Sequence, residues 1–186
     1  MKTNKLFMFA ALSAISAQAL ASDALQQEAR GIAKAFGGEL KAEVQKSMKA
    51  GGPVPTIAIC HDKAPKIAAA AAKKSGWDVS RTSLKIRNPE NAADAWETKV
   101  MQAFEARQAK GEALNGMDYA ETVETDGKKT FRYMMAIPTG KPCLHCHAAE
   151  IKAPVEASLK ELYPNDQARG FKLGDMRGAF SLSKGL

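Results

Sequence analysis

Apolar residues recur every four positions between residues 24 and 50, and this spacing predicts an amphipathic helix. The stripe consists of Ile32, Phe36, Leu40, Val44 and Met48. Gly37 and Gly38 lie inside the segment, and each glycine costs about 1 kcal/mol relative to alanine, so we expect an interruption or kink there. Gly51-Gly52-Pro53 predicts a firm end to the helix.

A short apolar stretch over residues 54–61 precedes a second helical pattern. Asp62 is placed to cap the N-terminus of that helix, and Pro65 falls within its first turn. The predicted helix is rich in alanine, runs to about Ser75 and ends at Gly76, a residue type favoured just after helices.

The next helix carries a signal at each end. Asp94 and Glu97 have the spacing of a capping box, and Lys110-Gly111 predicts the C-terminus. Residues 77–87 suit a strand, although their alternation is weak, and a shorter helix is expected at about 154–162.

The clearest β-strand pattern spans residues 118–137. Two runs flank Asp126-Gly127, a pair favoured in tight hairpin turns. Apolar residues alternate along the second run, which predicts one buried face made of Phe131, Tyr133, Met135 and Ile137. Residues 176–183 alternate again and predict a final strand. Helices followed by an antiparallel sheet indicate the α+β fold class.

The first 21 residues have the pattern of a secretory signal peptide. Lys2 and Lys5 form a positive start, an apolar stretch continues to about Ile15, and Ala19-Leu20-Ala21 fits a cleavage site. We expect cleavage after Ala21, export to the periplasm and one mature domain over residues 22–186; an uncleaved anchor is the alternative. Since no other apolar run approaches about 18 residues, we expect no membrane span in the mature chain.

The chain is 45% hydrophobic and 25% charged, a composition that supports a buried core and argues against disorder. Its net charge is +7, and loss of Lys2 and Lys5 with the signal peptide reduces this to +5. The basic residues are interspersed with acidic ones, so nucleic acid is not an expected partner. The mild positive bias favours docking to an acidic redox partner protein or binding of anionic haem propionates.

Cys143-Leu144-His145-Cys146-His147 is a C-x-x-C-H sequence, the attachment signal for a c-type haem. Two intervening residues let both thiols reach the vinyl groups at one edge of a single haem, and the next residue, His147, can then bind the iron. A zinc site, a thioredoxin-type redox pair and a plain disulfide are the alternatives. Zinc would need a second ligand pair, and the redox pair would need a βαβ pattern, and neither is present in the sequence.

Several residues are candidates for the second axial ligand of the iron. Met134 and Met135 lie in a predicted strand, where core packing is the ordinary role of methionine. His145 is expected to face solvent. Cys60 would be a free thiol in an oxidising compartment unless it is buried or bound to metal, and His61 is its neighbour. Chemistry alone favours Cys60 and His61 equally as the second axial ligand, and an open coordination site is the third possibility.

The chain resembles a bacterial family of exported, PAS-like haem proteins of the c type, first catalogued as a domain of unknown function. The residues that carry the resemblance are Cys60-His61-Asp62-Lys63-Ala64-Pro65, Gly76-Trp77, Arg81-Thr82-Ser83-Leu84-Lys85-Ile86-Arg87, Trp96-Glu97 and the C-x-x-C-H motif. Family members occur as single exported domains and as extracytoplasmic sensor modules.

The resemblance implies a PAS-like fold with a long N-terminal helix and an antiparallel sheet around one covalent haem. It implies that His147 is the proximal ligand and that Cys60 is the distal one. Arg81 and Arg87 fall within a matching segment, and their guanidinium groups suit the haem propionates.

Thiolate ligation predicts a low reduction potential, because an anionic ligand stabilises ferric iron. Electron transfer and redox sensing are therefore the expected functions, and a gas- or small-ligand-binding sensor module that works with a separate signalling partner is the alternative. The sequence contains no evident nucleophile–base constellation, so we do not expect an enzyme.

Overall fold

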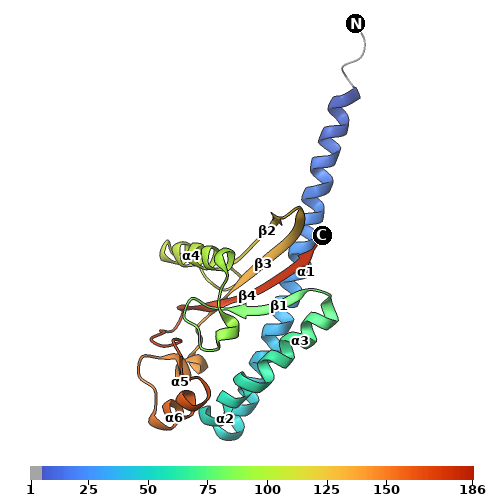
Figure 1. The fold of residues 1–186 in the computed structure, drawn as a ribbon. Coiled ribbons are helices and arrows are strands. Elements are labelled where there is room, and N and C mark those ends of the chain that lie inside the picture. The colour runs from blue at the N-terminus through green and yellow to red at the C-terminus, as the bar shows by residue number, and fades with distance from the viewer. Residues whose placement is uncertain (1–5) are drawn as a thin grey trace.

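The structure, a computed structural model, describes residues 6–186. Within this range, one antiparallel sheet has the strand order β1-β4-β3-β2, and helices pack on both of its faces (Figure 1). The strands are β1 (Asp78–Thr82), β2 (Asp118–Thr125), β3 (Lys128–Pro138) and β4 (Met176–Gly185). The predicted α+β class, with a long N-terminal helix and an antiparallel sheet, is confirmed.

The N-terminal helix α1 (Leu6–Gly51) contains the helix predicted over residues 24–50 and continues through Gly37 and Gly38. The expected interruption is therefore wrong. A Cβ atom on Gly37 would lie 2.7 Å from Cζ of Phe180, so glycine at this position lets α1 pack closely on β4. Residues 1–5 of the predicted signal peptide lie outside the described residues. No helix in the described part of the chain has both the length and the apolar character needed to cross a bilayer.

Helices α2 (Pro53–Ala58) and α3 (Ala64–Ser75) are joined by a π-helical turn, η1 (Ile59–Lys63). The predicted cap at Asp62 is wrong, because Asp62 lies inside this turn and the helical backbone continues through it. The Ala64 amide donates to the Ile59 carbonyl, five residues back, which is the wider spacing of a π-helix. The predicted end at Gly76 is confirmed, with this glycine in the left-handed conformation.

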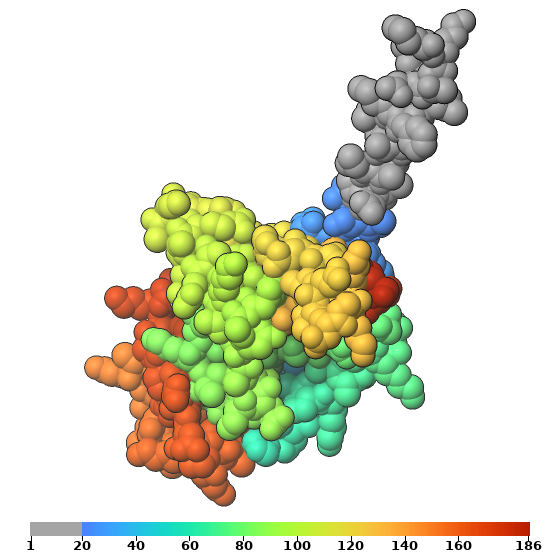
Figure 2. Space-filling model, turned by 45° about the horizontal axis from the view of Figure 1, so that its top comes forward, coloured from blue at the N-terminus to red at the C-terminus, as the bar shows by residue number. Residues whose placement is uncertain are grey.

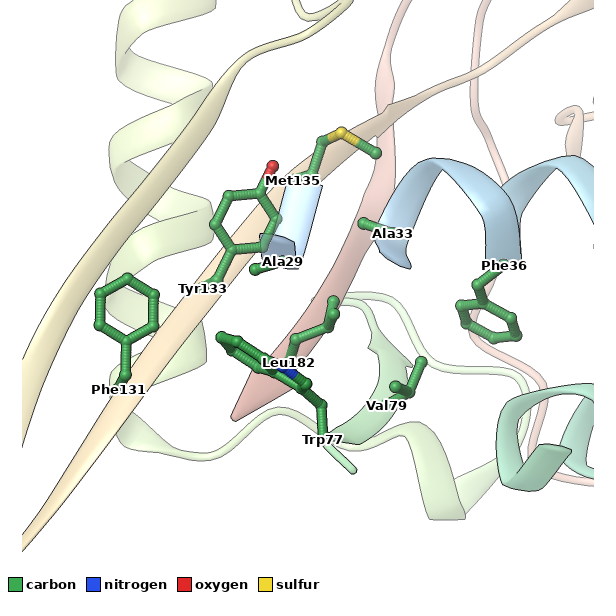
Figure 3. Close-up of a cluster of buried hydrophobic side chains, with 9 residues drawn as sticks. All are labelled: Ala29, Ala33, Phe36, Trp77, Val79, Phe131, Tyr133, Met135 and Leu182. Carbon is green, nitrogen blue, oxygen red and sulfur yellow. The ribbon is translucent and has the colours of Figure 1, made fainter. Parts of the chain in front are cut away.

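Strand β3 is buried on both faces, so the prediction of one buried face is incomplete. Phe131, Tyr133 and Met135 face α1 and form a core with Trp77 and other side chains (Figure 3). Met134 and Ala136 point to the opposite face, where they pack beneath α4 (Ala95–Ala109). Ile137, expected in the buried set, is partly exposed. A central strand between two helical layers is apolar on both sides, and simple alternation does not report this.

The strand predicted over residues 77–87 is shorter than expected, because β1 ends at Thr82. Beyond it, the Ser83 hydroxyl donates to the carbonyl of Arg177 at 2.8 Å and accepts from the amide of Lys85 at 3.2 Å. These side-chain bonds replace the regular ladder. A 3₁₀ turn, η2 (Pro89–Asn91), then leads to α4.

The local signals for the remaining elements are confirmed. Asp94 and Glu97 form the predicted capping box at the start of α4. On the molecular surface, α4 lies beside the β2–β3 hairpin (Figure 2). The rings of Trp96 and Tyr119 pack there, with their centroids 6.3 Å apart. Helix α6 (Ala153–Leu162) matches the short helix predicted at 154–162, and it packs beside α2 at one end of the sheet (Figure 1).

Candidate functional site

The C-x-x-C-H motif forms a single helical turn at the end of the sheet where α2 and α6 meet. Cys143 ends the 3₁₀ turn η3 (Lys141–Cys143), and Cys146 and His147 belong to α5 (Leu144–His147). Because helical residues three and four apart share a face, Cys143, Cys146 and His147 come together on one side of this turn. Both cysteines are half-buried free thiols, whereas His145 is exposed as predicted.

The imidazole of His147 is held in one orientation by a backbone carbonyl. Its Nδ1 lies 2.9 Å from the carbonyl oxygen of Ala168, so Nδ1 carries the proton and the lone pair remains on Nε2. That nitrogen faces Nε of Arg177 at 3.4 Å and Nη1 of Arg87 at 3.5 Å. Burial, together with the positive charges of Arg177 and Arg87, lowers the pKa of His147 well below its ordinary value. The imidazole is therefore neutral at neutral pH.

The arginine side chains at this site outnumber the carboxylates that balance their charge, and two of them, Arg87 and Arg177, lie next to His147. The cluster comprises Arg81, Arg87, Arg169 and Arg177. Two carboxylates accept from this cluster: Asp166 from Arg87 and Arg169, and Glu156 from Arg169 alone.

Arg177 shows the effect of this imbalance. It donates to the Ser83 hydroxyl at 3.0 Å as well as to His147. Burial and the neighbouring charges of Arg87 and Arg81 lower the pKa of Arg177 to about 10. The buried Nε of Arg87 has no hydrogen-bond partner among the described residues. The site therefore has unbalanced cationic donors, which suit an anionic group.

Cys60 lies in the π-helical turn η1, near Cys146 of the attachment motif. Its thiolate form would be close enough to raise the pKa of both Cys146 and Tyr163, whose burial is the larger cause in each case. Burial and this neighbour raise the pKa of Tyr163 to about 12. The Tyr163 ring also packs between His61, with the ring centroids 5.4 Å apart, and the guanidinium of Arg87.

The other candidates for a distal ligand lie elsewhere. The His61 side chain is 44% exposed, and its Nδ1 lies 2.6 Å from Oδ1 of Asp62. Met134 is fully buried beneath α4, and Met135 is buried against α1. The two methionines therefore have the core-packing role expected for them.

Comparison with known proteins places the chain in a family. The family model described as Tll0287-like matches residues 16–184. The chain belongs to the Tll0287-like family. Among solved structures, the crystal structure of the cyanobacterial haem protein Tll0287 is similar to this Tll0287-like chain, with 27% identity and a TM-score of 0.54. The match covers 66% of this chain and 70% of that one. No curated protein matches the chain.

The residues of this Tll0287-like site fit a haem. A neutral histidine with its Nδ1 proton held by a carbonyl is the arrangement of a metal-binding imidazole. Two thiols lie on the same helical turn, and the excess guanidinium groups match a ligand that carries two carboxylates. Among the side chains that the structure describes, no group of three or more His, Cys, Asp or Glu is arranged to hold a metal ion directly.

The structure brings the predicted site residues of this Tll0287-like chain into one region, with Nη1 of Arg87 3.5 Å from Nε2 of His147 and with Arg81 near enough for its charge to act on Arg177. Sequence reasoning missed Arg177, Asp166 and Tyr163. Arg177 carried a weak signal, because the residues between it and Lys184 in the final strand are all apolar or small. Asp166 lies in a polar loop sequence, which gave no signal.

Proposed function

We propose that this chain is an exported, periplasmic monohaem c-type cytochrome, with one haem joined covalently to Cys143 and Cys146 and with His147 as the proximal ligand. The single observation that carries the proposal is the His147 geometry, in which Nδ1 is held by Ala168 and Nε2 presents its lone pair beside two guanidinium groups. Similarity to the haem protein Tll0287 supports it. Bound haem supplies a one-electron iron couple.

Cys60 is the distal ligand in this proposal. It lies in η1, near enough to Cys146 for a thiolate at this position to raise the pKa of that thiol. His61 points instead to solvent and to Asp62, which favours Cys60 between the two adjacent candidates. A thiolate at this position donates more electron density than a neutral side chain and keeps the reduction potential low.

Arg81, Arg87 and Arg177 bind the haem propionates in this proposal. Their positive charges outnumber the negative charges of the carboxylates around them. Arg177 has only neutral hydrogen-bond partners among the described residues. Buried charges without counter-charges are costly, so two propionates would stabilise the cluster. Arg177 joins the two arginines named from the sequence.

Electron transfer or redox sensing is the role that we propose, with a separate redox partner protein and no enzymatic reaction. The π-helical turn favours sensing in particular, because such turns depart from regular α-helical hydrogen bonding and are frequent at functional sites. A change in Cys60 ligation would be transmitted directly to α2 and α3. If the thiolate is labile, binding of a gas or another small ligand is the second candidate function.

The first experiment tests attachment. Intact-protein mass spectrometry of the periplasmic chain is expected to show the mass of one added haem, and the Cys143→Ser/Cys146→Ser double variant is expected to lack it. A wild-type chain of unmodified mass in a host that matures c-type cytochromes would contradict the proposal.

The second experiment compares Cys60→Ala with His61→Ala, two substitutions in the same π-helical turn. The ferric wild-type protein is expected to give the EPR spectrum of a low-spin thiolate complex, and only Cys60→Ala should abolish it. If His61→Ala alone changes the spectrum, His61 is the distal ligand. Rapid carbon monoxide binding by the ferrous wild-type protein would favour the small-ligand role over electron transfer.

A further inference from the structure

We propose that Asp166 is a positioning residue that sets the orientation and the electron-donor strength of His147, acting through Ala168 and Arg87 without contacting the imidazole. The inference rests on the proposed role of His147 as an iron ligand. It adds a residue to the site that neither the motif nor the comparisons indicate.

The first connection runs through the backbone of one residue. Oδ1 of Asp166 accepts from the amide of Ala168 at 2.9 Å, and the carbonyl of Ala168 lies 2.9 Å from Nδ1 of His147. The carboxylate therefore fixes the residue that holds the imidazole. Hydrogen bonds to the second nitrogen of a ligating histidine set its tautomer, its ring orientation and its basicity.

The second connection runs through Arg87. Oδ2 of Asp166 accepts from Nη2 of Arg87 at 3.0 Å, and the same nitrogen donates to the carbonyl of Cys146. Nη1 of this guanidinium faces Nε2 of His147 at 3.5 Å. Asp166 thus restrains Arg87 between the cysteine and the histidine of the attachment motif.

Backbone hydrogen bonds also hold the segment of residues 166–171 in place. The Gln167 amide donates to the carbonyl of Ile86 at 2.8 Å, and the Phe171 amide donates to the carbonyl of His147 at 3.0 Å. Asp166 is consequently fixed relative to both the Arg87 segment and the motif. Its side chain is only 4% exposed, so its charge is weakly screened by solvent.

The charge of Asp166 has a predictable effect on the iron couple. A buried anion near the site stabilises the ferric state through its charge, and by fixing Ala168 it keeps the hydrogen bond from Nδ1 of His147 aligned, which makes the imidazole a better donor. Both effects act in the same direction. Loss of the charge should therefore favour the ferrous state.

Glu156 provides a matched control. It also accepts from Arg169, but it lies on α6, is 33% exposed and has no hydrogen bond to Ala168 or Arg87. Asp166→Asn and Glu156→Gln each remove one negative charge from the same arginine. Only Asp166→Asn removes a negative charge that lies beside the groups that hold His147.

The test is a spectroelectrochemical titration of the holoproteins. For Asp166→Asn, we expect the ferrous-to-ferric ratio at a fixed electrode potential to rise about tenfold, which is about 59 mV for a one-electron couple. Its EPR g-values should also shift, whereas Glu156→Gln should keep the wild-type ratio within about twofold, a shift of less than about 18 mV. Equal shifts in both variants, or no shift in Asp166→Asn, would overturn the inference.

Attachment is measured on the same samples by mass spectrometry. If the wild-type chain carries no haem, the proposed function fails; if all chains carry haem and their potentials agree, only the inference about Asp166 fails. Asp166→Ser keeps a short acceptor for the Ala168 amide and replaces the asparagine variant if that variant does not fold. If neither variant yields holoprotein while Glu156→Gln does, Asp166 has a folding role and the inference is overturned.

Discussion

Replacing His147 with glutamine is predicted to reduce the acid sensitivity of the chain prepared without haem. In the folded chain, burial and the charges of Arg177 and Arg87 lower the pKa of His147 well below 6.5. In the unfolded chain, the imidazole regains an ordinary pKa of about 6.5. As the pH falls below that value, the unfolded state binds a proton that the folded state does not, and the free energy of unfolding decreases.

The size of this effect follows from the uptake of one proton. A difference of one bound proton changes the free energy of unfolding by about 1.4 kcal/mol per pH unit. The loss should begin near pH 6.5 and continue on acidification until the folded-state pKa is reached. Carboxylates that titrate in the same range remain in both proteins, so the difference between wild type and His147→Gln isolates this residue.

Urea denaturation at several values between about pH 5.5 and about pH 7.5 measures the slope. The wild-type slope should exceed that of His147→Gln by nearly one proton at the acid end. His145→Gln, an exposed histidine in the same helix, should retain the wild-type slope. Identical slopes for wild type and His147→Gln would refute the idea that the folded chain lowers the pKa of His147.

Two other substitutions test the core and the sheet. Met134→Leu keeps the volume of a fully buried side chain, so it should cost less than about 1.5 kcal/mol in urea denaturation and leave the optical spectrum of the holoprotein unchanged; an altered ligand band would instead make Met134 an iron ligand. Gly178→Ala should lower the free energy of unfolding by about 2 kcal/mol or more, because its Cβ would lie 2.2 Å from the carbonyl oxygen of Thr82. An unchanged urea midpoint for Gly178→Ala would show that β1 and β4 separate without cost.

The elements that were predictable from sequence depend on short-range signals. The Asp126-Gly127 turn, the Asp94/Glu97 capping box and the C-x-x-C-H motif each specify geometry within a few residues, and the structure contains all three local arrangements. The long helix followed from spacing alone. Gly37 and Gly38 do not interrupt it, and the missing side chain of Gly37 leaves room for the Phe180 ring, a contact that the spacing along the helix does not reveal.

The features that escaped prediction depend on contacts between distant segments. Arg177 and Arg87 are ninety positions apart and meet only because β4 pairs with β1. Asp166 reaches His147 through a turn whose sequence is merely polar. The sequence predicts a helix start at the π-helical turn, because Asp62 and Pro65 are typical of helix N-termini. The same two residues also fit within or just after a widened turn, so the sequence does not distinguish the two.

The position of β4 in the sheet has a consequence for the order of folding. This strand lies between β1 and β3, although it follows the attachment motif in the chain. Its pairings span long loops; the Ser80 hydroxyl, for example, donates to the carbonyl of Ser181, 101 residues away. Contacts of such separation form slowly, because loop closure is unfavourable until the strands pair. We therefore expect Cys143 and Cys146 to remain accessible to an attachment machinery until β4 inserts and brings Arg177 to His147.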